Sequence, residues 1–97
     1  MNRQQLIDVL NAHYSEIEQK FNVKQLRLFG SAARDELRPD SDIDMLVGFK
    51  GPATFDGYMD LMFYLEELLG NKVDLVTEKG LRKEVRSNVE KDAIRVA

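Results

Sequence analysis

The stretch that decides the fold is RLFGSAARDELRPDSDID, residues 27–44. An apolar run ends at Gly30, and the small, helix-forming residues that follow predict one short helical turn. Pro39 and the Asp/Ser cluster at residues 40–42 indicate a loop. The apolar residues 43–49 then predict a mostly buried strand. A strand, a short helix, a loop and a second strand therefore follow one another here.

Outward from this stretch, the spacing of apolar residues predicts further helices and strands. Steps of three and four predict helices over residues 4–21 and 55–69, with Gly70 ending the second. Short apolar runs predict strands at 25–29 and 72–76. A last short helix is predicted from Leu81, Val85 and Val89, restarted by a capping box of Ser87 and Glu90.

This alternation of helices and strands predicts the fold class. We expect an α/β (α+β) domain with a small mixed β-sheet flanked by helices. The 97 residues suffice for one core, so we expect a single domain over residues 1–97. No internal repeat or linker is visible in the sequence.

Composition and charge exclude several classes of protein. The absence of cysteine excludes a disulfide scaffold and a thiolate zinc site. No apolar run approaches about 18 residues, and no signal peptide is recognisable, so we expect a cytoplasmic protein without a membrane partner. Residues 1–78 carry 8 basic and 14 acidic side chains, which argues against tight nonspecific binding to nucleic acid. Residues 79–97 carry 6 basic and 3 acidic side chains, which fits either a solvated helix face or contact with an acidic partner or nucleotide.

The Gly30-Ser31 turn is the first candidate site. Glycine allows a ligand to approach the backbone, and a following helix start offers unpaired N–H groups to a phosphate. It is not a Walker loop, because no Gly-Lys-Ser/Thr follows at the required spacing. Gly-Ser turns are also common in proteins without any ligand.

The acidic residues give two further candidates. Asp42 and Asp44 point to the same face of a strand, roughly 6.6 Å apart, which suits a hard cation such as Mg²⁺. The alternative is a capped turn in which Ser41 and Asp42 bond backbone amides. Asp74 lies in an apolar strand and joins the pair if that strand lies beside residues 43–49; otherwise it points to water. An EF-hand is excluded, because Met45 and Gly51 replace the Gly and Glu that its loop needs.

Together these residues resemble the minimal nucleotidyltransferases of the DNA polymerase β-like superfamily. The resemblance rests on Gly30-Ser31, ten intervening residues, Asp42-Ile43-Asp44, and Asp74 in Val-Asp-Leu-Val. It covers about residues 24–95 and implies the nucleotidyltransferase fold. One departure is Asp35, where the family usually has glycine.

The resemblance implies a role for each candidate residue. Asp42, Asp44 and Asp74 would be the catalytic and metal-binding residues, holding two Mg²⁺ ions, with Asp74 nearest the acceptor and able to take its proton. Gly30 and Ser31 would hold the phosphates of ATP, the substrate. Arg34 would reach a phosphate oxygen, or would instead pair at the surface with Asp35 or Glu36.

The resemblance also implies a partner, because minimal nucleotidyltransferases of this size are often antitoxins of HEPN ribonuclease toxins. We therefore expect a protein adenylyltransferase that moves AMP from ATP to a hydroxyl, that of a tyrosine, on a HEPN-domain toxin. The protein would then be the antitoxin of a type VII-like toxin–antitoxin system. One alternative is a binding module that neutralises its partner by masking it. Another is a transferase for a small molecule or an RNA end.

Overall fold

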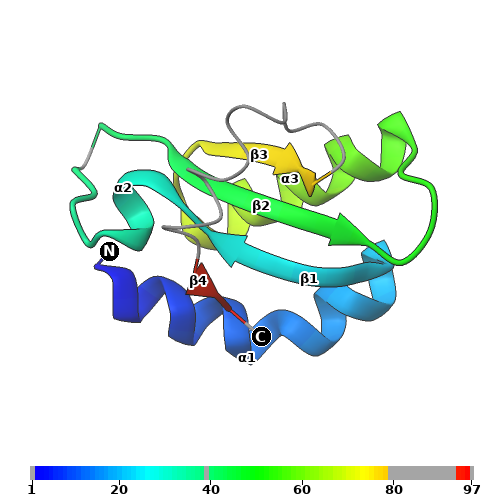
Figure 1. The fold of residues 1–97 in the computed structure, drawn as a ribbon, viewed down its shortest axis with the longest axis horizontal. Helices are drawn as coiled ribbons and strands as arrows, with labels where there is room; N and C mark the ends of the chain where they lie inside the picture. The colour runs from blue at the N-terminus through cyan, green and yellow to red at the C-terminus, as the bar shows by residue number, and fades with distance from the viewer. Residues whose placement is uncertain (1, 39, 79–93, 97) are drawn as a thin grey trace.

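The elements follow one another in the predicted order. The computed structural model describes residues 2–38, 40–78 and 94–96. Its elements are α1 (Arg3–Phe21), β1 (Val23–Leu28), α2 (Gly30–Ala33), β2 (Ile43–Phe49), α3 (Phe55–Leu69), β3 (Val73–Thr77) and β4 (Ile94–Arg95), as Figure 1 shows. The predicted helix around Leu81, Val85 and Val89, with its capping box at Ser87 and Glu90, lies outside the described residues.

The four strands form one mixed sheet in the order β3-β2-β1-β4. Strand β1 is antiparallel to both β2 and β4, whereas β2 and β3 run parallel. A parallel pair needs a crossover connection, and α3 supplies it between β2 and β3 (Figure 1). The predicted small mixed sheet is therefore confirmed, with β4 as an additional edge strand that the sequence pattern did not indicate.

The hydrophobic core lies between one face of the sheet and the two long helices. Every second residue along the strands is buried on this face, and the helices contribute residues at helical spacing. These are Leu6, Leu10 and Ile17 of α1, Leu61, Leu65 and Leu69 of α3, and Leu26, Leu28, Ile43, Met45, Val47, Val73 and Leu75 of the sheet. The intervening strand residues, among them Asp44 and Asp74, are consequently left to the opposite face of the sheet.

The ends of the long helices correct two predicted boundaries. Helix α1 begins at a capping box of Asn2 and Gln5 and ends at Asn22, whose φ of 56° is left-handed. That turn reverses the chain at once, so β1 starts at the fully buried Val23 and not at residue 25. Gly70 ends α3 with a φ of 65°, and β3 starts one residue later than predicted. None of the helices in the described part of the chain has the length and apolarity needed to cross a membrane.

Candidate active site

The turn between β1 and α2 brings backbone against the Asp44 side chain. Gly30 has a φ of 63°, which is left-handed and free of strain only for glycine. A Cβ at this position would overlap Asp44 Oδ2 and lie 3.2 Å from Asp44 Cγ. The backbone N–H of Phe29 also donates to the Asp44 carbonyl oxygen at 3.0 Å. Both the left-handed backbone and the lack of space for a Cβ therefore require glycine here, and the Asp44 carboxylate lies directly against the turn.

Asp44 and Asp74 are direct neighbours across the parallel strands β2 and β3. The pKa of Asp44 is raised from 3.8 to about 6. The largest cause is partial burial, followed in order by the Asp74 charge, a hydrogen bond with Asp74 and the Asp42 charge. The Arg34 guanidinium acts in the opposite direction. Two carboxylates held in register in this way repel each other, which a proton or a cation between them would relieve.

The other predicted residues lie around this pair. Asp42 is exposed just before β2, and Arg34 is exposed at the end of α2. The effect of both on the pKa of Asp44 shows that their charges are near its carboxylate. Arg34 Nε also forms an exposed ion pair with Glu36 Oε2 at 3.3 Å. Such surface pairing with Glu36 was the predicted alternative to a phosphate contact. Ser31 is half-buried in α2, next to Gly30.

The chemistry of the donors fits a hard cation, although the three acids do not form a closed cage. Among residues 2–38, 40–78 and 94–96, no three His, Asp or Glu side chains are gathered tightly enough to hold a metal ion by themselves. Asp44 and Asp74 are adjacent in register, whereas Asp42 is an exposed residue just before β2. Mg²⁺ is usually bound through one or two carboxylates together with water and substrate phosphates. The adjacent pair therefore fits a Mg²⁺ ion that arrives with a phosphorylated substrate.

A second polar group on the same sheet face was missed by the sequence reasoning. Glu78, directly after β3, accepts hydrogen bonds from Gln25 Nε2 and from Arg27 Nη2, the latter at 3.2 Å. These contacts tie β1 to β3 across Gly48 of β2, where a Cβ would approach the Glu78 carboxylate to 2.8 Å. Strand alternation alone places residues 25 and 27 on the face of Asp44, but their contact with Glu78 depends on strand order.

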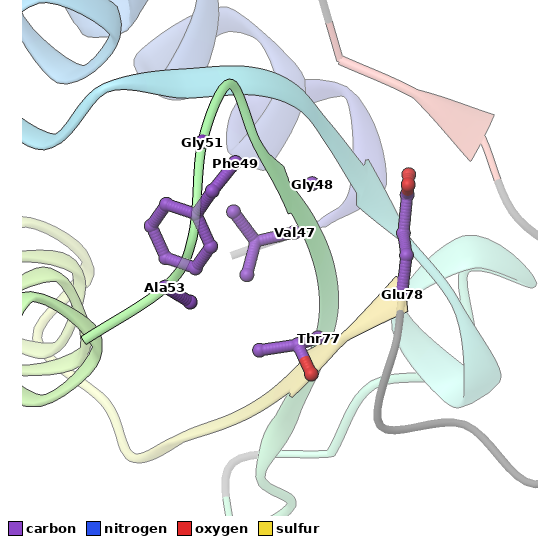
Figure 2. Close-up of a pocket in the computed structure, with 7 residues that line it drawn as sticks. All are labelled: Val47, Gly48, Phe49, Gly51, Ala53, Thr77 and Glu78. Carbon is purple, nitrogen blue, oxygen red and sulfur yellow. The ribbon is translucent and has the colours of Figure 1, made fainter. Parts of the chain in front are cut away.

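Two hollows of the described structure lie away from the acidic pair. A cavity of about 80 Å³ is lined by Val47, Gly48, Phe49, Gly51, Ala53, Thr77 and Glu78 (Figure 2). Figure 2 shows Thr77 and Glu78 extending in different directions from the end of β3, opposite to the end that carries Asp74. A wider groove of about 550 Å³ lies between the end of α1 and α3. Neither contains a predicted site residue, so the chemistry of the acidic pair, and not cavity size, identifies the candidate site.

Comparison with known proteins agrees with this arrangement. The family described as "Nucleotidyltransferase domain" matches residues 10–96. This chain belongs to that family. It is 40% identical over 92 residues to the "Putative protein adenylyltransferase MJ1379" of Methanocaldococcus jannaschii, covering 92% of each chain. It is 34% identical over 93 residues to the "Protein adenylyltransferase MntA" of Thermococcus cleftensis, covering 96% of this chain and 94% of the relative.

Solved structures support the same family and fold. A "putative minimal nucleotidyltransferase" is 36% identical, with a TM-score of 0.83, covering 97% of this chain and 95% of the other. A complex of a tri-AMPylated Shewanella oneidensis HEPN toxin with its MNT antitoxin matches with a TM-score of 0.68 at 17% identity, over 94% of this chain and 71% of the other, and so shows the fold alone. The nucleotidyltransferase fold and the predicted membership of the minimal nucleotidyltransferases are confirmed, whereas the roles of the individual site residues stay predictions.

Proposed function

We propose that this nucleotidyltransferase is a Mg²⁺-dependent protein adenylyltransferase that moves AMP from ATP to a hydroxyl group of a partner protein. The observation that carries the proposal is the contact of the Gly30 turn with Asp44, which is itself in register with Asp74. A phosphate-binding turn and paired carboxylates at one place are the two requirements of two-metal nucleotidyl transfer.

The carboxylates are the proposed metal ligands. Asp42 and Asp44 would hold two Mg²⁺ ions, and Asp74 would hold the one nearest the acceptor. When bound, the ions neutralise charge on the phosphate oxygens and align the reacting groups. The raised pKa of Asp44 agrees with a site that favours added positive charge.

The α2 turn is the proposed holder of the ATP phosphates. Gly30 lets the turn lie directly against the Asp44 carboxylate. Gly30 and Ser31 would offer backbone N–H groups, and Ser31 its hydroxyl, to the β- and γ-phosphates. Arg34, next to the acidic group, would exchange its exposed Glu36 partner for a phosphate oxygen, because a charge-assisted bond to phosphate is stronger than an exposed ion pair.

The reaction has a simple balance. The acceptor oxygen forms a bond to the α-phosphorus, the bond from that phosphorus to the bridging oxygen breaks, and pyrophosphate leaves with the bonding electrons. The hydroxyl proton passes to the carboxylate of Asp74, which is exposed and therefore open to an acceptor from a second protein.

The proposed acceptor is a tyrosine on a HEPN-domain ribonuclease toxin, which would make this protein an antitoxin in the cytoplasm. Support comes from relatives that are named protein adenylyltransferases and from the MNT antitoxin complex with an AMPylated toxin. The acidic residues 1–78 favour a protein acceptor over nucleic acid.

The proposal is tested by incubating the protein with ATP labelled on the α-phosphate, Mg²⁺ and the product of the neighbouring gene, which we expect to be a HEPN-domain protein. We expect label on the partner, lost by at least about 100-fold in Asp44→Asn and in Asp74→Asn, since each removes a metal ligand. Asp8→Asn is the matched control, because Asp8 is exposed on α1 and its change should leave transfer unchanged. Mass spectrometry of the product should find AMP on a tyrosine.

Other results would point elsewhere. Neutralisation of the partner without any label transfer would overturn the enzymatic proposal and favour the masking module. Label on RNA or a small molecule, with none on protein, would retain the nucleotidyl transfer and overturn the acceptor class.

A further inference from the structure

The turn that follows α2 has a closed hydrogen-bond pattern that usually requires glycine. The Glu36 N–H donates to the Ser31 carbonyl at 2.8 Å, and the Asp35 N–H donates to the Ala32 carbonyl at 3.3 Å. These two bonds form a Schellman motif, whose left-handed position is occupied by Asp35 with a φ of 59°. An aspartate in this conformation is tolerated but less favourable than glycine, so its side chain should offer a compensating contact.

That contact is made with the beginning of α1. Asp35 Oδ1 accepts a hydrogen bond from the backbone N–H of Arg3 at 2.8 Å. Arg3 is the first residue of α1, where the N–H groups have no partner within the helix and a negative charge is favoured. Arg3 also makes a second hydrogen bond, in which its Nη1 donates to the Ala33 carbonyl at 3.0 Å. We name these two bonds the Asp35–Arg3 clamp.

The clamp joins the short helix α2 to the long helix α1. Helix α2 has only four residues, whereas the 19-residue helix α1 is anchored in the core by Leu6 and Leu10. The two bonds end at Ala33 and Asp35, three and five positions after Gly30. Fixing this end restricts the positions that the Gly30-Ser31 backbone can take against Asp44.

The clamp also fixes the direction in which the Asp35 carboxylate points. Asp35 follows Arg34, so a freely rotating carboxylate would lie near the proposed phosphate site. Its bond to the start of α1 directs it toward unsatisfied N–H groups, where the helix dipole offsets its charge.

We infer that Asp35 is a positioning residue, which through the Asp35–Arg3 clamp holds the α2 turn ready for the nucleotide phosphates. This inference rests on the proposed function of that turn. It differs from the proposed chemistry, since no atom of Asp35 or Arg3 is required to touch the substrate.

Four variants separate the two bonds of the clamp from the fold of the turn. Asp35→Gly fits the left-handed position but has no acceptor, and Asp35→Asn retains both the conformation and an acceptor oxygen. Arg3→Pro removes the N–H at a helix position that tolerates proline, after Asn2 whose extended ψ of 175° suits a following proline. Arg3→Ala is its control, because it loses the guanidinium but keeps the N–H.

The readouts are the KM for ATP and kcat of transfer, the affinity for a non-hydrolysable ATP analogue with Mg²⁺ by calorimetry, and the thermal midpoint. We expect Asp35→Gly and Arg3→Pro each to raise KM and weaken analogue binding by roughly threefold to tenfold, with kcat changed by less than about twofold. Asp35→Asn should stay within about twofold of the parent, and Arg3→Ala should lie between. The Asp35→Gly/Arg3→Pro double variant should lose no more than Arg3→Pro alone, because the bond that Asp35→Gly removes is already absent in Arg3→Pro.

The clamp and the proposed function fail in different ways. If the parent, Asp35→Gly and Arg3→Pro all bind the analogue equally well, the role of the clamp is overturned and the proposed function stands. A lower thermal midpoint with unchanged KM and affinity would show a merely structural contact and also overturn it. A parent that binds the analogue without transferring AMP would overturn the proposed activity, while the affinities still decide on the clamp. A parent that neither binds nor transfers would overturn both.

Discussion

Asp44 is the residue at which stability and the proposed chemistry conflict most directly. Its carboxylate lies against Gly30 and in register with Asp74, so the folded protein holds two like charges together. Core burial on the other face of the sheet fixes the strands and thereby maintains this repulsion. A site of this kind is expected where a ligand later supplies the opposite charge.

The raised pKa of Asp44 predicts how stability depends on pH. The folded pKa of about 6 exceeds the unfolded value of 3.8, so the folded state binds the proton more tightly. The contribution of this group to the free energy of unfolding should therefore fall as the pH rises from about 4 to about 6, and stay low above. Relative to the parent, Asp44→Asn should gain on the order of 1–2 kcal/mol across that window, allowing for solvent screening.

Urea unfolding at a series of pH values measures this difference without interference from other acids that both proteins share. The exposed Asp8→Asn variant is the matched control for replacing one aspartate by asparagine away from the acidic pair. A difference between the parent and Asp44→Asn that is constant from pH 4 to pH 8 would contradict the prediction.

Individual residues of the site differ in whether the sequence alone predicts their role. Gly30, Asp44 and Asp74 were predicted because their types and spacing carry the chemistry, and the structure brings them together. The partner of Asp35 was not predictable, because Arg3 is 32 positions away and its contact is a backbone N–H. Such a donor exists at every residue except proline, so no sequence pattern distinguishes it.

Among the elements, β1 and β3 are linked although they are not neighbours in the sheet. Glu78 reaches over β2 to Arg27 and Gln25, and only the absence of a side chain at Gly48 leaves room for it. The side chains of Arg27 and Glu78 are 18% and 23% exposed, so water weakens this ion pair less than a fully exposed one. The link therefore helps to hold β3, which carries Asp74, in register.

A double-mutant cycle tests this link between strands. Gly48→Ala should place a Cβ within 2.8 Å of the Glu78 carboxylate, displace it and cost about 1 kcal/mol of unfolding free energy. In a Glu78→Ala background the same change should cost close to nothing, because the displaced group is absent. Gly51→Ala is the control, since its nearest atom, Asn22 Nδ2, lies at an ordinary 3.7 Å. Equal costs in both backgrounds would contradict the link.

The elements were predicted where a periodic pattern was long enough to define them. The ranges 43–49 and 55–69 were predicted correctly, because continuous apolar residues and helical spacing mark them throughout. The two residues of β4 have no periodicity, and only their pairing with Arg27 and Leu28 makes them a strand. At the sequence level, the placement of β3 beside β2 was only a condition for bringing Asp74 to the pair, since pairing between distant strands has no local signal.

On the scale of the whole molecule, the candidate site exists only in the folded chain. Asp44 and Asp74 come from different strands, and the Gly30 turn comes from a third segment. The unfolded chain has no comparable arrangement of these groups. Any ligand that needs all three must therefore bind the folded state preferentially and shift the unfolding equilibrium.

This linkage gives a prediction that needs no partner protein. Mg²⁺ with a non-hydrolysable ATP analogue, at about 100 times its dissociation constant, should stabilise the parent by about 2.7 kcal/mol. For a domain of this size, that corresponds to a rise of roughly 10–20 °C in the thermal midpoint. The Asp44→Asn/Asp74→Asn variant should start from a higher midpoint without ligand, because the repulsion is gone, but should rise little on adding Mg²⁺ and the analogue. An equal rise in parent and variant would place binding outside the acidic pair. If the fold holds the two charges together, the variant should have the higher midpoint without ligand and the smaller rise on adding it.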